Sequence, residues 1–179
     1  MPEALEDFIR LGFIARREGR AEDARRLFSE GLALWDEVQG QASRARLLTG
    51  LGQIERDSGN TDAALQHYGE AAELYRGLSD PLRVAHTIRH VADILRGSGF
   101  VEEARPHYAE ALGIYRAHSE APALDVANTL RGFALAEEEV GRTEEAKAFW
   151  QEAKQLYGSV SVEGGVRESD AHLKLLSSH

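Results

Sequence analysis

Apolar and small residues recur at fixed intervals along the chain, and the most regular stretch occurs four times. Each copy begins with glycine, has alanine five residues later, and has aromatic residues nine and sixteen residues later with a small residue between them. The copies occupy residues 19–35, 59–75, 99–115 and 141–157. This spacing predicts one amphipathic helix in each copy, and its recurrence indicates a repeat protein.

A second apolar pattern precedes each of these glycines. Apolar residues lie eleven, eight and five places before the glycine, as Leu48, Leu51 and Ile54 do before Gly59. They form one stripe of a helix, and the glycine stands where a positive φ commonly follows a helix C-terminus. The glycines are 40, 40 and 42 residues apart. We therefore predict an all-α protein in which each repeat is a pair of helices.

The pattern predicts a single solenoid of four helix pairs with a C-terminal capping helix. The repeats span about 3–38, 43–78, 82–118 and 123–158, and the capping helix about 163–177. Val166, Leu173 and Leu176 share one face of that last helix, which would cover the open flank of the fourth repeat. The alternative is the first helix of a repeat that is cut short. Pro106, about one turn into a predicted helix, predicts a bend or a late start there.

Composition narrows the classes of function. The net charge of −9 argues against a general affinity for nucleic acid or an anionic membrane. No apolar run approaches the roughly 18 residues of a membrane span, and the acidic start MPEALEDF does not resemble a secretory signal. The absence of cysteine excludes disulfides and thiolate metal sites. We expect a cytoplasmic protein.

These columns resemble those of the tetratricopeptide repeats. The match rests on the pairs Leu11-Gly12 and Leu51-Gly52, on the turn glycine, and on the alanine and aromatic residue that follow it. It covers about residues 3–157, although the common repeat has only about 34 residues. The resemblance implies a right-handed α-α superhelix whose first helices line a concave groove. It also implies a non-catalytic role, in which the groove binds a peptide or a partner helix.

No motif for catalysis is found in the sequence. A Gly-rich phosphate loop, a nucleophile elbow and an HExxH motif are all missing, so we predict no catalytic residue and no cofactor. His86 and His90 lie one turn apart with Asp93 on the same face, a set that could ligate a metal. Thr87 stands where a metalloprotease needs glutamate, however, and Arg89 would repel the ion. A metal-binding or small-molecule-binding protein is therefore an alternative to histidines that simply line a groove.

The rows of the first helices opposite the packed stripe predict the groove surface. They hold seven arginines and three acids, a formal excess of four positive charges. Such a groove would favour an acidic peptide or a free carboxylate. Ile9, Phe13 and Leu135 would supply apolar anchors. The residues that we predict to bind the ligand are Arg16, Arg46, Gln53, Arg56, His86, Arg89, His90, Asp93, Arg96, Asn128, Arg131 and Leu135.

Three other interpretations stay open at this point. The arginines of these rows could pair inside the protein with Asp57, Asp93 or Glu138. The chain could be a regulatory or sensor module of a larger signalling or transcription protein. The partner could also be a second copy of this chain, because an uncovered end of the solenoid or the apolar groove residues could form a homodimer.

Overall fold

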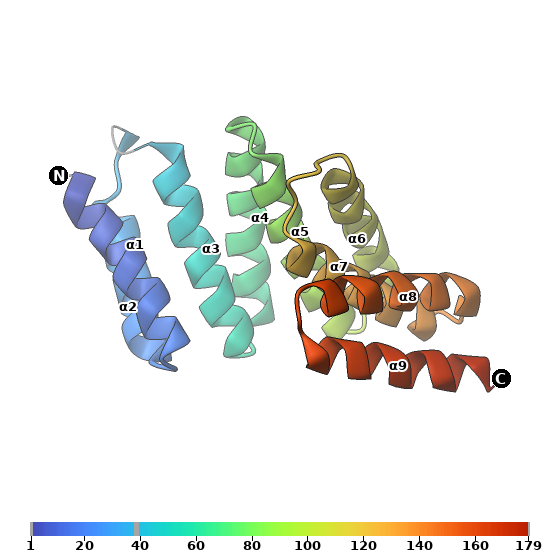
Figure 1. The fold of residues 1–179 in the computed structure, drawn as a ribbon. Helices are drawn as coiled ribbons and strands as arrows, with labels where there is room; N and C mark the ends of the chain where they lie inside the picture. Colours follow the sequence, from blue (N-terminus) through green and yellow to red (C-terminus); the bar gives the residue numbers. More distant parts are fainter. Residues whose placement is uncertain (1, 38–39, 179) are drawn as a thin grey trace. The chain divides into compact units, whose positions relative to one another are not determined.

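The structure, a computed structural model, describes residues 2–37 and 40–178 and is helical throughout this range apart from turns (Figure 1). The helices are α1 (Pro2–Arg17), α2 (Ala21–Leu34), α3 (Gln41–Asp57), α4 (Thr61–Gly77), α5 (Pro81–Gly97), α6 (Val101–Arg116), α7 (Ala123–Glu139), α8 (Thr143–Ser159) and α9 (Glu163–Ser177). The predicted all-α class is confirmed. The predicted end of the first repeat, residue 38, lies outside the described residues. Among the described helices, none is long and apolar enough to cross a membrane.

The chain divides into two compact halves, Met1–Thr87 and Ile88–His179. In the N-terminal half α1 packs on α2 and α3, α2 packs on α3, and α3 packs on α4. In the C-terminal half α7 packs on α6 and α8, and α9 packs on α8. Helix α5 contributes residues to both halves. Each half therefore contains helix pairs and apolar clusters of its own.

A left-handed glycine ends the first helix of every repeat, as the sequence predicts. Gly19, Gly59, Gly99 and Gly141 have φ values of 76°, 79°, 85° and 78°. In the second repeat the amide of Asn60 donates to the carbonyl of Glu55 at 2.8 Å, and the amide of Gly59 donates to that of Arg56 at 3.0 Å. This pair of bonds is a Schellman motif, which satisfies carbonyls at the helix end. Only glycine adopts the required φ without strain.

Small and aromatic columns form the centre of the core. Its fully buried members include Ala24, Ala64, Ala104 and Ala146, and the rings of Phe28, Tyr68, Tyr108 and Trp150. A Cβ placed on Gly12 of α1 or on Gly50 of α3 would lie 2.5 Å from a ring carbon of Phe28. The ring of Phe28 therefore lies against two first helices and joins the first repeat to the second.

A helix forms at the end of the chain where one was predicted, whereas one detail of α6 differs from the prediction. Helix α9 covers the residues for which the capping helix was predicted, and the buried Gly165 lies against the ring of Tyr157. The late start predicted at Pro106 is wrong, because α6 begins at Val101 and continues through the proline. Pro106 lies just past the first turn, so its missing N–H removes only the bond to the carbonyl of Glu102.

Replacing Gly50 by alanine tests the contact between α3 and the ring of Phe28. The added methyl group has no free space beside this buried ring, so we expect the free energy of unfolding to fall by about 1–3 kcal/mol. Gly69 is the matched control, because a Cβ on this exposed helical glycine meets nothing within 4 Å. Gly69→Ala should raise the free energy of unfolding by roughly 0.5–1 kcal/mol. Urea unfolding measures both, and stabilisation by Gly50→Ala would contradict the packing.

Candidate functional site

Carboxylates hold the predicted groove arginines of the N-terminal half. Arg16 of α1 and Arg56 of α3 both donate to Asp57, at 2.9 and 2.8 Å. Arg46 of α3 donates to both carboxylate oxygens of Glu6 in α1, at 2.9 and 2.7 Å. The ion pairs between Arg16 and Asp57 and between Arg46 and Glu6 thus connect the two first helices of this half.

The two arginines also change the pKa of Asp57. Partial burial alone would raise the pKa of Asp57, but the hydrogen bonds and charges of Arg56 and Arg16 hold it below its usual value. Of the other predicted residues here, His86 is half-buried. Gln53 is also half-buried, and its side-chain carbonyl oxygen is enclosed without a hydrogen-bond partner in the described part of the chain.

In the C-terminal half, Arg89 and Asp93 belong to the predicted groove surface. Arg89 is only 8% exposed; it donates to Asp93 at 2.6 Å and to Nε2 of His90 at 2.8 Å. The hydroxyl of Tyr108 donates to the other oxygen of Asp93 at 2.7 Å. Burial, together with the charge of Asp93, raises the pKa of Tyr108. The carboxylate of Asp93 therefore already has two hydrogen-bond donors.

Helix α9 also contributes a residue to this surface, Glu168. Arg131 of α7 makes a two-pronged ion pair with Glu168 of α9, with both N–O distances at 2.7 Å. The hydrogen bond from Arg131 lowers the pKa of Glu168, against the opposing effect of partial burial. Beside this pair, the hydroxyl of Tyr157 donates to the side-chain oxygen of Asn128 at 2.8 Å.

The two groups of side chains act on one another electrostatically. The pKa of Tyr157 is raised chiefly by burial, and the charges of Arg131, Glu168, Arg89 and Asp93 all act on its hydroxyl. These residues, which come from α5, α7, α8 and α9, therefore belong to one connected polar region.

Two donors in this polar region have no acceptor among the described residues. They are Nε of Arg89 and the hydroxyl of Tyr115, both of which are buried. Burial also raises the pKa of Tyr115, with Asp125 adding to the shift and Arg89 opposing it. We name the whole group the C-terminal polar cluster: Arg89, Asp93, Tyr115, Asn128, Arg131, Tyr157 and Glu168.

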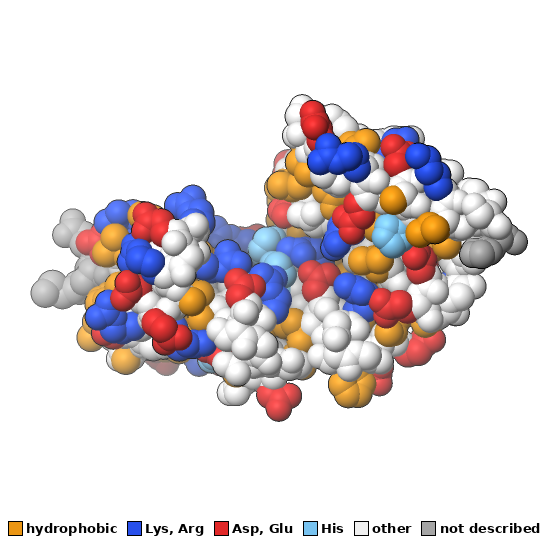
Figure 2. Space-filling view, turned by 90° about the horizontal axis from the view of Figure 1, so that it is seen from below, with side chains coloured by type: hydrophobic (Ala, Val, Ile, Leu, Met, Phe, Trp, Pro, Cys, Tyr) orange, Lys and Arg blue, Asp and Glu red, His pale blue; other side chains and the backbone are white. Residues whose placement is uncertain are grey.

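The structure cancels the excess of positive charge that the sequence predicts for the groove rows. Each of the seven arginines has a carboxylate partner at 2.6 to 2.9 Å. Four of these carboxylates lie beside the predicted rows and were not counted: Asp7, Asp57, Glu139 and Glu168. Figure 2 shows the same interleaving, with Lys and Arg side chains next to Asp and Glu side chains on the visible face.

Two of the predicted apolar anchors are core residues. Ile9 is fully buried, and the ring of Phe13 packs edge-to-face on Phe28 with 5.0 Å between the centroids. The prediction that they project into a groove is wrong, because this side of α1 is packed within the N-terminal half. Leu135 is half-buried in α7.

The alternative metal site is also wrong. Across residues 2–37 and 40–178, no three His, Cys, Asp or Glu side chains gather closely enough to hold a metal ion. His86, His90 and Asp93 share a face of α5, but the carboxylate of Asp93 already accepts hydrogen bonds from Arg89 and Tyr108.

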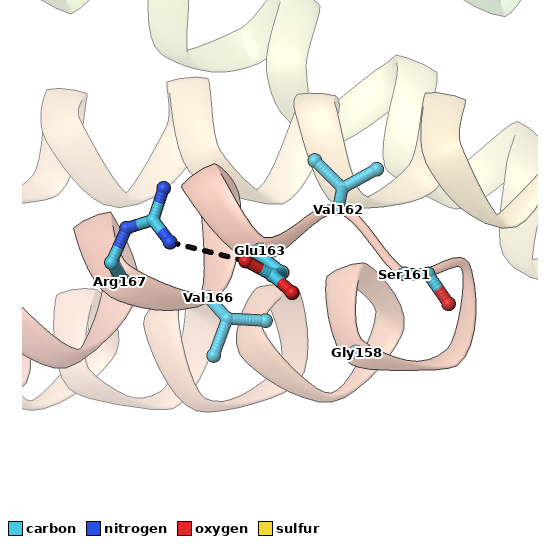
Figure 3. A pocket seen from close by; sticks show the side chains of 6 residues that line it. All are labelled: Gly158, Ser161, Val162, Glu163, Val166 and Arg167. Atoms are coloured by element: carbon cyan, nitrogen blue, oxygen red, sulfur yellow. Dashed lines mark hydrogen bonds and ion pairs between the residues drawn. The ribbon is translucent and has the colours of Figure 1, made fainter.

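A shallow pocket lies at the turn between α8 and α9 (Figure 3). Its lining consists of Gly158, Ser161, Val162, Glu163, Val166 and Arg167, and Arg167 donates to Glu163 at 3.3 Å. Both members of this ion pair are strongly exposed. A recognition site needs several convergent polar groups, and the polar side chains of this pocket are that solvated pair and Ser161.

The repeat period itself contained a signal for the residues of α9. Glu168 follows Asn128 by 40 residues, and His172 follows Gly132 by the same interval. His172 stacks on Trp150 with 4.3 Å between ring centroids, and its Nδ1 lies 2.9 Å from Glu138. Helix α9 therefore stands in the frame of a fifth first helix. Carrying the 40-residue period past residue 157 would have placed Glu168 in the predicted face.

Comparison with known proteins decides the family. A tetratricopeptide repeat model matches residues 3–77 and 83–159. This chain belongs to the tetratricopeptide repeat family. Each matched segment contains two of the four helix pairs. Such repeats are protein-interaction modules. A search of curated protein sequences finds no match to the chain.

Solved structures share the fold at low sequence identity. BtubC (BKLC) from P. vanneervenii aligns with a TM-score of 0.80 and 20% identity, over 90% of this chain and 66% of that one. The apo form of RapI gives 0.85 and 13%, over 97% and 63%. A Rap protein complexed with Competence and Sporulation Factor gives 0.79 and 15%, over 97% and 48%. The chain thus spans less than two thirds of each of these proteins.

A second surface pocket, which we call the notch, lies in the two tetratricopeptide repeats of the N-terminal half. This notch is lined by Arg25, Ser29, Leu32, Ala33, Leu51, Glu55 and His67, from α2, α3 and α4. Arg25 donates to Glu55 at 2.8 Å, and Asn60 donates to Glu55 at 2.6 Å. This notch was not identified from the sequence, because only Leu51 and His67 among its residues lie at positions expected to pack.

The pair between Arg131 and Glu168 predicts a specific pH dependence. Because the folded pKa of Glu168 is lowered, its contribution is fully present above the unfolded value of about 4.3 and is lost as the pH falls through the folded value. Glu168→Gln should therefore flatten the fall in unfolding free energy between neutral and acidic pH. Urea unfolding over a pH series measures this slope. The exposed Glu163 is the control, and Glu163→Gln should leave the slope unchanged; an unchanged slope in Glu168→Gln would contradict the assignment.

Proposed function

We propose that this tetratricopeptide repeat chain is a non-catalytic module that binds a peptide or a partner helix at its C-terminal polar cluster. Membership of the family supports the general role. A Rap protein of similar fold has been crystallised in complex with Competence and Sporulation Factor, which supports the binding of a partner molecule by this architecture. This chain spans 48% of that protein, so only the mode of binding is proposed here and not the factor.

The observation that carries the proposal is the pair of buried donors without acceptors. A buried polar group that lacks its partner costs about 1–3 kcal/mol, and folded proteins rarely keep one without a reason. Nε of Arg89 and the hydroxyl of Tyr115 meet this description within one region. A ligand that brings acceptor oxygens there would recover this cost on binding.

The charges around these donors favour a particular ligand chemistry. The cluster contains two arginines and two carboxylates, so its formal charge is zero and no strong field draws in every acidic molecule. A ligand carboxylate can still replace Glu168 at Arg131, because that guanidinium already binds a carboxylate through two hydrogen bonds. Backbone carbonyls of a peptide can accept from Arg89 and Tyr115. An extended peptide with an acidic side chain fits both requirements.

Removing the hydroxyl of Tyr115 separates binding from folding. Tyr115→Phe deletes a buried donor without a partner, so we expect the free energy of unfolding to rise by on the order of 1 kcal/mol. The same change should weaken peptide binding about fivefold, the equivalent of one hydrogen bond. The probes are fluorescein-labelled peptides of equal length and graded glutamate content, measured by fluorescence anisotropy.

Tyr75→Phe is the matched control for Tyr115→Phe. Tyr75 occupies the same column in the N-terminal half, where its hydroxyl lies 3.5 Å from that of Thr49. It should leave peptide binding unchanged. Unaltered binding in Tyr115→Phe, or equal losses in both variants, would contradict the site.

Arg131 tests the preference for acidic peptides. Arg131→Gln should abolish the difference in affinity between glutamate-rich and glutamate-free peptides, since it removes the group that exchanges carboxylates. Arg167→Gln is the control, because Arg167 is an exposed arginine of α9 in a pair with Glu163. If binding is equally tight for all peptides in the wild type, or equally reduced by both substitutions, the acidic preference is wrong.

A further inference from the structure

The two halves of the chain follow the same frame, offset by 80 to 82 residues. Arg25 donates to Glu55 at 2.8 Å in the N-terminal half, and Arg105 donates to Glu137 at 2.8 Å in the C-terminal half. These four residues occupy matching columns, six places after and four places before a turn glycine. Equivalent positions in the two halves can therefore be compared directly.

One pair of equivalent positions differs in a way that changes the surface. In the C-terminal half Phe133 and Phe149 stack with 4.5 Å between ring centroids, and Phe133 also stacks on Tyr108 at 5.8 Å. The matching residues of the N-terminal half are Leu51 and His67. Both line the notch between α2, α3 and α4. The notch thus lies where the other half has a continuous stack of rings.

The residues that line the notch favour an uncharged, planar ligand group. Leu32 and Leu51 provide apolar surface, and Arg25 and Glu55 are paired with one another, so neither offers a free charge. Burial lowers the pKa of His67, against the opposing charges of Glu55 and Glu70, and its ring is therefore neutral at physiological pH. An imidazole beside leucine side chains can stack with an aromatic ring in the offset or edge-to-face arrangements that rings prefer.

We propose that this notch binds an aromatic side chain of a protein partner, which packs against Leu51 and His67, the residues that stand where the C-terminal half stacks Phe133 and Phe149. The occupant is inferred from the chain itself, since the equivalent columns in the second half already hold stacked rings. The site lies in the N-terminal half and involves no residue of the C-terminal polar cluster. It would give a partner a second point of attachment, with apolar rather than polar chemistry.

The test uses amides of single amino acids as probes. N-acetyl-tryptophanamide and N-acetyl-phenylalaninamide are titrated into the isotope-labelled full chain, with N-acetyl-leucinamide and N-acetyl-alaninamide in parallel. We expect the aromatic amides to shift the methyl resonances of Leu32 and Leu51 and the ring resonances of His67 saturably. Absence of shifts at these residues, or equal shifts with the leucine or alanine amide, would overturn the proposal.

A double substitution introduces two phenylalanine rings that fill the notch. Leu51→Phe combined with His67→Phe copies the residues of the second half, and should abolish the shifts caused by the aromatic amides. The melting temperature should rise by roughly 2–4 °C if the new stack contributes about 1 kcal/mol. His67→Phe alone is the milder variant and should weaken the shifts. Saturable shifts at Leu32 that persist in both variants would overturn the proposal.

His107→Phe is the matched control for these changes. His107 occupies the column of His67 in the third repeat and is also half-buried, but it does not line the notch. It should leave the shifts of Leu32 and Leu51 as in the wild type, and equal loss in His107→Phe would count against the site. Tyr115→Phe should likewise leave them intact, so failure of the notch and failure of the polar cluster are observed separately.

Discussion

The fold depends on a large ring that a second helix inserts against the first helices on either side of it. Phe28 fits between α1 and α3 because Gly12 and Gly50 carry no side chain at the points of contact. Tyr108 meets Gly132 of the next repeat in the same way. A buried aromatic ring is among the largest apolar contributions that one residue makes. This single contact therefore fixes both the spacing of the helices within a repeat and the stacking of one repeat on the next.

Ion pairs between neighbouring first helices follow from that stacking. Arg16 and Asp57 link α1 to α3, and Arg96 and Glu139 link α5 to α7 from matching columns. Pairs at exposed positions contribute at most about 1 kcal/mol each. Their main consequence is for recognition. Every arginine of the predicted groove surface is already paired with a carboxylate. A ligand therefore has to replace one of these carboxylates or supply hydrogen-bond acceptors to donors that lack one.

The two halves use one frame for different chemistry. Where Phe13 packs on Phe28 in the first half, Asp93 accepts a hydrogen bond from Tyr108 in the second. Where Phe133 and Phe149 stack in the second half, the first half has Leu51 and His67. Columns that carry the same residue type in all repeats hold the fold together. The columns that differ between the halves produce the polar cluster in one and the notch in the other.

The sequence by itself determined the helix pairs, the left-handed glycines such as Gly59, the buried small and aromatic columns and the helix at the end of the chain. These features depend on spacing within a few turns, and all but the terminal helix are repeated four times. Only the tertiary structure decided that Arg16 meets Asp57, 41 residues away, and that Arg131 meets Glu168, 37 residues away. Such partners depend on how neighbouring helices pack side by side, and a count of charges on one helix face omits them. Ile9 was misplaced for the same reason, because the side of α1 that it occupies is buried by the packing of neighbouring helices and not by anything within α1 itself.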